Sequence, residues 1–181
     1  VRNWYYYGHG GPYEIGCDRH TIDTNGLVVG SALTSSRSKS RLFSWQIAKA
    51  VRPNRYRFVF LDGCDTALGN WPETFSVSKT NRDLAFYQND PKHRRPSAFI
   101  GWGTEPGGAG WGTIQHYWDF RDYWMGFWAN SIWEPLHDAL DDGCRYSNWI
   151  DLNKFWSGIR LYGYTVMQME EYNHKGDWRY P

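Results

Sequence analysis

Residues 57–61 constrain the fold most strongly, because their sequence, RFVFL, is a nearly continuous apolar run. A strand with one face in water alternates apolar and polar residues, whereas a strand covered on both faces need not alternate. Pro53 lies before the run and Gly63 follows it, and both residue types interrupt regular structure. The run therefore predicts a central strand of a parallel sheet that is covered on both faces.

Around this run, segments with strand-like composition alternate with segments of helical periodicity. This order favours a layered α/β fold with a mostly parallel sheet, and the length of 181 residues suits a single domain, 1–181. The predicted strands lie at 4–7, 57–61, 98–102 and 159–169, and the predicted helices at 36–51 and 119–142.

Four local features refine this prediction. Gly143 is expected to end the long second helix, and another helix is expected to begin in the stretch after Asp62. Residues 27–33 form either a short strand or the approach to the next helix. The polar segment 76–97 is expected to be a surface insertion.

Composition excludes several classes of protein. The formal net charge of +1 favours neither a nucleic acid nor a membrane surface as the main partner. No apolar run approaches the roughly 18 residues that cross a bilayer. The chain has 12 Trp, 13 Tyr and 9 Phe, and such residues either fill cores or line peptide and carbohydrate grooves. We expect the tyrosines of the first strand to belong to the core.

The three cysteines are too few for a disulfide scaffold, and their odd number leaves at least one outside any pair. Cys17 and Cys144 could pair, and the sequence indicates no compartment. Val1 lies almost directly before the first predicted strand, so we expect further sequence upstream. A segment of the same precursor is therefore a candidate partner.

His9 and Cys64 each follow the carboxyl end of a predicted strand, where open α/β sheets bind their ligands. If the two strands are parallel neighbours, both side chains emerge at the same edge of the sheet. A thiol is a strong nucleophile, and an imidazole beside it can accept its proton and donate one to a leaving amine. The backbone N–H groups of Gly10 and Cys64 are the candidate oxyanion donors.

Two segments resemble the catalytic motifs of the caspase-like cysteine peptidases, nearest to their metacaspase, legumain and gingipain branches. They are YYYGHG at residues 5–10 and FVFLDGC at residues 58–64, and AFIGW at 98–102 and IRLYGYTV at 159–166 are similar to later strands of that fold. The resemblance implies a three-layer sandwich whose first strands precede Val1. It also implies a His9–Cys64 dyad that cleaves a peptide or protein substrate through an acyl-enzyme, without a cofactor.

The same resemblance places Asp62, two residues before the cysteine, in the primary specificity pocket. A carboxylate there favours Arg or Lys before the scissile bond, because a buried cation needs a partner. Trp102, Glu105 and Trp111 are further candidates for this pocket. An equally ordinary role for Asp62 is to cap the amino terminus of a helix. The chain departs from the pattern of that family after the cysteine, where it has Asp65-Thr66-Ala67 in place of a frequent Ser-Gly. A charge on Asp65 beside the thiol tends to raise the thiol pKa.

Three other interpretations compete with the peptidase. Cys64 could be a buried structural cysteine, a common role for this residue. The domain could also be a catalytically silent relative that binds a peptide, a glycan or a partner subunit. A metal site is the third, since Cys17 and His20 form a C-x2-H pair, but structural zinc needs two close pairs. The other histidines, His93, His116, His137 and His174, are scattered, so no metal is expected.

Overall fold

The computed structural model describes residues 3–17, 40–51, 56–89, 96–103, 119–120, 122–126, 135–147 and 158–167. The segment 27–33 lies outside these residues. Within the described part of the chain, no helix is long and apolar enough to cross a membrane.

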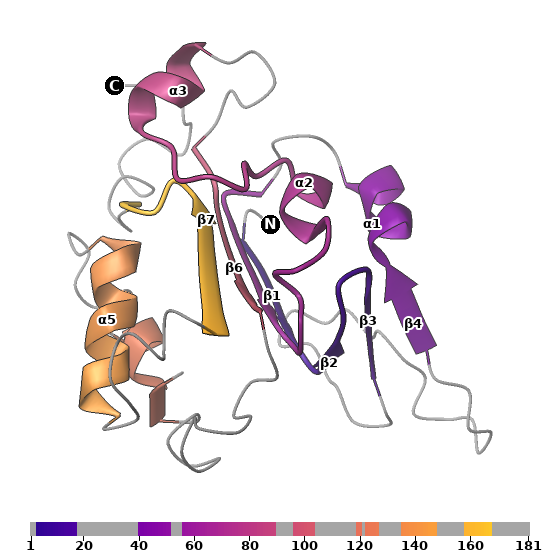
Figure 1. Cartoon of the computed structure of the whole chain (residues 1–181), viewed down its shortest axis with the longest axis horizontal. Coiled ribbons are helices and arrows are strands. Elements are labelled where there is room, and N and C mark those ends of the chain that lie inside the picture. The colour runs from indigo at the N-terminus through magenta and orange to yellow at the C-terminus, as the bar shows by residue number, and fades with distance from the viewer. Residues whose placement is uncertain are drawn as a thin grey trace.

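The main sheet has the strand order β1-β5-β6-β7 (Figure 1). Strands β1 (Asn3–Tyr7), β5 (Phe58–Asp62) and β6 (Ala98–Trp102) are parallel neighbours, and β7 (Ile159–Gly163) is antiparallel to β6. All five residues of β5 and of β6 are buried, as a strand covered on both faces requires. The predictions of an α/β fold and of a mostly parallel sheet are confirmed.

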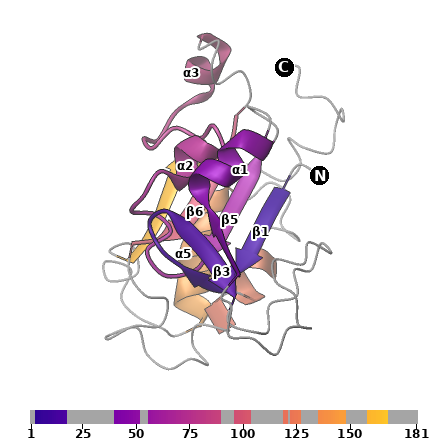
Figure 2. The same ribbon diagram turned by 90° about the vertical axis from the view of Figure 1, so that its right-hand side faces the viewer.

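Helices cover both faces of this sheet, and alternate residues of each strand feed two separate hydrophobic cores. Phe58 and Phe60 of β5 pack with α5 (Leu136–Tyr146) on one face. Val59 and Leu61 pack on the other face with α1 (Ser44–Ala50) and α2 (Trp71–Thr74). In Figure 2, α1 and α2 accordingly lie in front of the sheet and α5 lies behind it.

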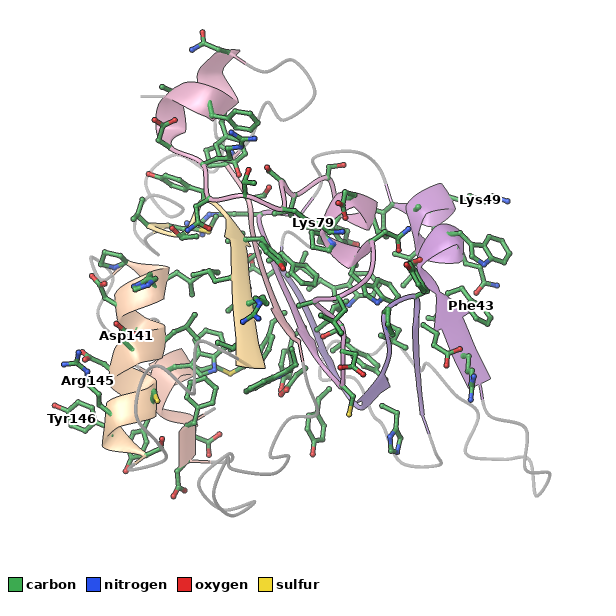
Figure 3. The ribbon with its side chains drawn as sticks, viewed as in Figure 1. Phe43, Lys49, Lys79, Asp141, Arg145 and Tyr146 are labelled. Atoms are coloured by element: carbon green, nitrogen blue, oxygen red, sulfur yellow. The ribbon has the colours of Figure 1, made fainter. Side chains whose placement is uncertain are left out.

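The outer surfaces of these helices carry polar and aromatic side chains. Figure 3 shows Lys49 on α1 and Arg145 and Tyr146 on α5, pointing away from the sheet on opposite sides of the molecule. Both helices are therefore amphipathic, with one stripe toward the sheet and one toward solvent.

A second, small sheet lies beside α1 and has the order β2-β3-β4, with antiparallel pairing (Figure 1). Its strands are β2 (His9–Gly10), β3 (Glu14–Cys17) and β4 (Ser40–Phe43). Only Gly8 separates β2 from β1, so the chain passes directly from the main sheet into the small one. His9 therefore belongs to the small sheet, and Cys64 follows a strand of the main sheet.

Three predicted boundaries are wrong. Residues 40–43 form β4 instead of the first half of a helix, because they pair with β3, and Arg41 also forms an ion pair with Glu14 at 2.8 Å. No helix begins directly after Asp62, since residues 63–70 form turns and α2 begins at Trp71. The helix expected at 119–142 is interrupted at Pro135, whose backbone is extended, and Gly143 does not end it, because α5 runs from Leu136 to Tyr146 with Gly143 buried inside.

Two other segments differ from expectation in extent. The last strand stops at Gly163, which adopts a left-handed φ of +84°, so the chain turns there and the strand does not continue to 169. The segment 76–97 contains helix α3 (Leu84–Asn89) and contributes the buried side chains of Val77 and Tyr87 to the two cores.

Candidate active site

The structure brings the backbones around His9 and Cys64 to one edge of the main sheet. Tyr7 at the end of β1 pairs with Asp62 at the end of β5. The Gly8 N–H donates to the Asp62 carbonyl at 3.1 Å, so the parallel pairing continues one residue beyond the strand. His9 is exposed and Cys64 is half-buried. The two residues that the sequence selects thus follow neighbouring strand ends.

Two glycines allow these turns to touch. A Cβ added to Gly63 would lie 2.7 Å from the Gly8 carbonyl oxygen and 3.1 Å from the Gly10 nitrogen. A Cβ added to Gly10 would lie 2.8 Å from the Cys64 carbonyl oxygen. Real Cβ atoms do not approach other atoms so closely, which means that only glycine fits at these positions. His9 and Cys64 are therefore carried by backbone segments in direct contact.

The N–H of Gly10 is directed toward the Cys64 turn. In an antiparallel ladder, successive N–H groups of one strand point alternately toward the partner strand and away from it. The Gly11 N–H donates to the Glu14 carbonyl at 2.8 Å, across the turn that leads into β3. The N–H of the preceding residue, Gly10, therefore faces away from β3, on the side where Gly63 lies.

The turn after Cys64 has an unusual backbone. Asp65 adopts a φ of +56°, in the left-handed region that few residues other than Gly, Asn and Asp occupy. Such conformations persist where the surroundings hold them, and they are common at functional sites. Here the hydroxyl of the fully buried Thr66 lies 2.7 Å from the Leu61 carbonyl oxygen and 2.9 Å from the Gly63 carbonyl oxygen, and it shares its one hydrogen between them.

Asp62 lies at the end of β5 with its side chain only 1% exposed. The Trp102 indole N–H of β6 donates to its Oδ1 at 2.8 Å, and the Tyr5 hydroxyl of β1 donates to its Oδ2 at 3.2 Å. Since no helix begins after Asp62, it does not cap the predicted helix. Its carboxylate is instead oriented by the two strands that flank its own.

The other pocket candidates are placed as follows. Trp102 is fully buried, so in this structure it contributes through its bond to Asp62 and presents no surface to solvent. Glu105 and Trp111 lie outside the described residues.

Within the described ranges, no group of three or more His, Cys, Asp or Glu side chains is arranged to hold a metal ion. His137 lies on α5, where its Nδ1 is 3.5 Å from an Asp138 carboxylate oxygen. Cys144 is buried in the same helix. The structure does not describe the other candidate metal ligands. These are the Cys17 side chain and the histidines at 20, 93, 116 and 174.

The sequence did not identify the hydroxyls of Tyr5, Tyr6 and Thr66 as parts of the site. Tyr6 is buried and Tyr5 half-buried, as expected of core residues, whereas Tyr7 at the end of β1 is 38% exposed and does not belong to the core. The Tyr5 hydroxyl bonds Asp62, and the Tyr6 hydroxyl bonds the His9 carbonyl at 2.6 Å. The sequence did hold one signal for these bonds, because a buried tyrosine hydroxyl normally has a hydrogen-bond partner. Successive residues of a strand also point to opposite sides of the sheet, so Tyr5 and Tyr6 had to find different partners.

Comparisons of the chain with models of protein families, with curated proteins and with solved structures found no match.

Proposed function

We propose that this chain is a caspase-like cysteine endopeptidase in which Cys64 is the nucleophile and His9 the general acid and base. The observation that carries the proposal is the contact between the Gly8–Gly10 and Gly63–Cys64 backbones at the ends of two parallel strands. A thiol and an imidazole on adjacent turns form the pair that nucleophilic catalysis by cysteine needs.

The reaction has two steps. In the first, His9 accepts the thiol proton, and Cys64 Sγ bonds to the peptide carbonyl carbon. The oxyanion that forms accepts hydrogen bonds from the N–H groups of Gly10 and Cys64. The C–N bond then breaks, and His9 gives its proton to the departing amine. In the second, His9 takes a proton from water, which attacks the thioester and releases the carboxylic acid product and the thiol.

Asp62 gives the site its preference for Arg or Lys before the cleaved bond. The Tyr5 phenol and the Trp102 indole are neutral donors, so these two bonds orient the carboxylate without cancelling its charge. A carboxylate held in this way next to Cys64 attracts a cationic side chain and disfavours an acidic one.

A panel of fluorogenic peptides tests this proposal. The peptides carry Arg, Lys, Asn or Asp before the cleavage site and are incubated with the wild type, with Cys64→Ala, and with Cys144→Ala as the matched control, since Cys144 is buried in α5 away from both turns. We expect cleavage after Arg or Lys that Cys64→Ala abolishes and Cys144→Ala retains. Cleavage that survives in Cys64→Ala would rule out Cys64 as the nucleophile.

Asp62→Asn tests the specificity part separately. An asparagine keeps the size of the side chain and an acceptor for Trp102 but loses the negative charge. We expect kcat/KM for Arg and Lys peptides to fall about 100-fold or more, with little change for the Asn peptide. An equal fall for all peptides would assign Asp62 a structural role only.

One observation favours the alternative, a catalytically silent domain that binds a peptide, a glycan or a partner subunit. Asp62 is 1% exposed and both of its oxygens accept bonds from within the protein, as in a purely structural carboxylate. Thiol alkylation separates the two functions, because an activated cysteine reacts faster than a structural one. Equal, slow labelling of Cys64 and Cys144 would favour the silent domain.

A further inference from the structure

A buried tyrosine hydroxyl contacts the backbone of the short strand that carries His9. Tyr6 is 6% exposed and belongs to the core on the α1 face of the sheet. Its hydroxyl accepts a bond from the Gly16 N–H at 3.0 Å and lies 2.6 Å from both the His9 and the Gly16 carbonyl oxygens. His9 and Gly16 are paired across the β2–β3 ladder. The hydroxyl therefore ties the His9 backbone to β3.

A second buried hydroxyl lies behind the turn that carries Cys64. Thr66 Oγ1 has one hydrogen, which it shares between the carbonyls of Leu61 (2.7 Å) and Gly63 (2.9 Å), and it accepts a bond from the backbone N–H of Trp102 at 3.1 Å. The Ala67 N–H donates to the Trp102 carbonyl at 2.9 Å. The Cys64 turn is therefore attached to the end of β6 as well as to β5.

Thr66 also contacts the His9 turn through its methyl group. A Cβ added to Gly10 would lie 2.7 Å from Thr66 Cγ2, so the methyl packs directly on Gly10. The hydroxyl of Thr66 thus fixes one turn while its methyl limits the approach of the other. Catalytic groups must be held within about 0.5 Å of their working positions, and a small displacement strongly lowers the rate.

We propose that Tyr6 and Thr66 are positioning residues that set the separation between the His9 imidazole and the Cys64 thiol. The inference rests on the proposed function. Neither hydroxyl needs to touch substrate, because each acts on the backbone of a turn. His9 lies in the short strand β2 of the small sheet, whereas Cys64 lies in the turn after β5 of the main sheet, and the two hydroxyls attach these segments to neighbouring strands.

The test measures the rate of Cys64 alkylation by iodoacetamide as a function of pH, with the labelled peptide identified by mass spectrometry. An imidazole beside the thiol stabilises the thiolate, so the wild type should react at lower pH than His9→Ala. Tyr6→Phe and Thr66→Val remove only the hydroxyls. We expect their profiles to move toward that of His9→Ala, and kcat for peptide cleavage to fall about tenfold with little change in KM.

Two matched variants separate positioning from general stability. Tyr87→Phe removes another buried tyrosine hydroxyl, which donates to the Ser97 carbonyl at 3.1 Å before β6 begins. Ser147→Ala removes another buried hydroxyl, which donates to the Cys144 carbonyl at 2.9 Å at the end of α5. We expect both variants to keep the wild-type alkylation profile and a kcat within about twofold of the wild type.

Two results would overturn the inference while leaving the peptidase intact. One is a wild-type profile in Tyr6→Phe and Thr66→Val, and the other is an equal shift in Tyr87→Phe. A different result, identical profiles for the wild type and His9→Ala, would instead overturn the proposed dyad and with it the need for positioning.

Discussion

At the scale of single residues, Gly10 and Gly11 are neighbours in sequence but differ in what surrounds them. A Cβ on Gly10 would meet the Cys64 carbonyl oxygen at 2.8 Å, whereas a Cβ on Gly11 would meet Glu14 at an ordinary 3.5 Å. We expect Gly10→Ala to cost about 1–3 kcal/mol of unfolding free energy and to lower kcat/KM about 100-fold or more. Urea denaturation and peptide cleavage measure both effects, with Gly11→Ala as the control. Similar losses in the two variants would contradict the contact between the turns.

The phenol of Tyr87 shows how burial changes the pKa of a side chain. Desolvation raises its pKa from 10.0 to about 12, although its bond to Ser97 acts in the opposite direction. A raised folded-state pKa stabilises the fold fully below pH 10, and this contribution is lost as the pH rises from about 10 to about 12. Urea titrations at pH 9 and pH 12 should show that the wild type loses about 2 kcal/mol more unfolding free energy than Tyr87→Phe. Equal losses would mean that Tyr87 ionises normally.

At the scale of elements, Gly143 shows a tertiary contact that overrides helix propensity. Replacing a helical Gly by Ala normally stabilises a helix by about 1 kcal/mol. Here a Cβ added to Gly143 would lie 2.6 Å from Trp124 Cβ and 2.9 Å from the Trp124 backbone nitrogen. We expect Gly143→Ala to destabilise the protein by about 1–3 kcal/mol in urea denaturation. In Gly126→Ala, where no described atom lies within 4 Å, the change should be neutral or stabilising.

The same contrast explains which elements could be predicted. The strands at 58–62 and 98–102 were predictable because their apolar runs are local signals. Strand β4 was not, since Leu42, Trp45 and Ala48 fit a helical spacing and only pairing with β3 makes residues 40–43 a strand. The helix expected after Asp62 failed for a similar reason, because bonds from Thr66 and Ala67 to β5 and β6 hold that segment in turns.

At the scale of the whole molecule, the two candidate catalytic residues depend on different sheets. Strands β5 and β6 are buried along their full length, whereas β2 has two residues, one exposed and one half-buried. Regions with few buried contacts open at lower free energy than the core. We expect amides of β3 to exchange with solvent faster than those of β5, and Cys64 activation by His9 to disappear at lower urea than global unfolding. Hydrogen exchange and alkylation in urea measure this, and coincident transitions would contradict it.

The sequence by itself determined the strands of the main sheet, the mostly parallel α/β class and the placement of His9 and Cys64 after two strand ends, because these follow from local apolar runs and the glycines after them. Only the tertiary structure decided that the two turns touch, that Tyr5 and Trp102 orient Asp62, and that Tyr6 and Thr66 hold the turns. Those partners lie up to 57 residues apart in the chain, and no local pattern specifies which strand ends become neighbours.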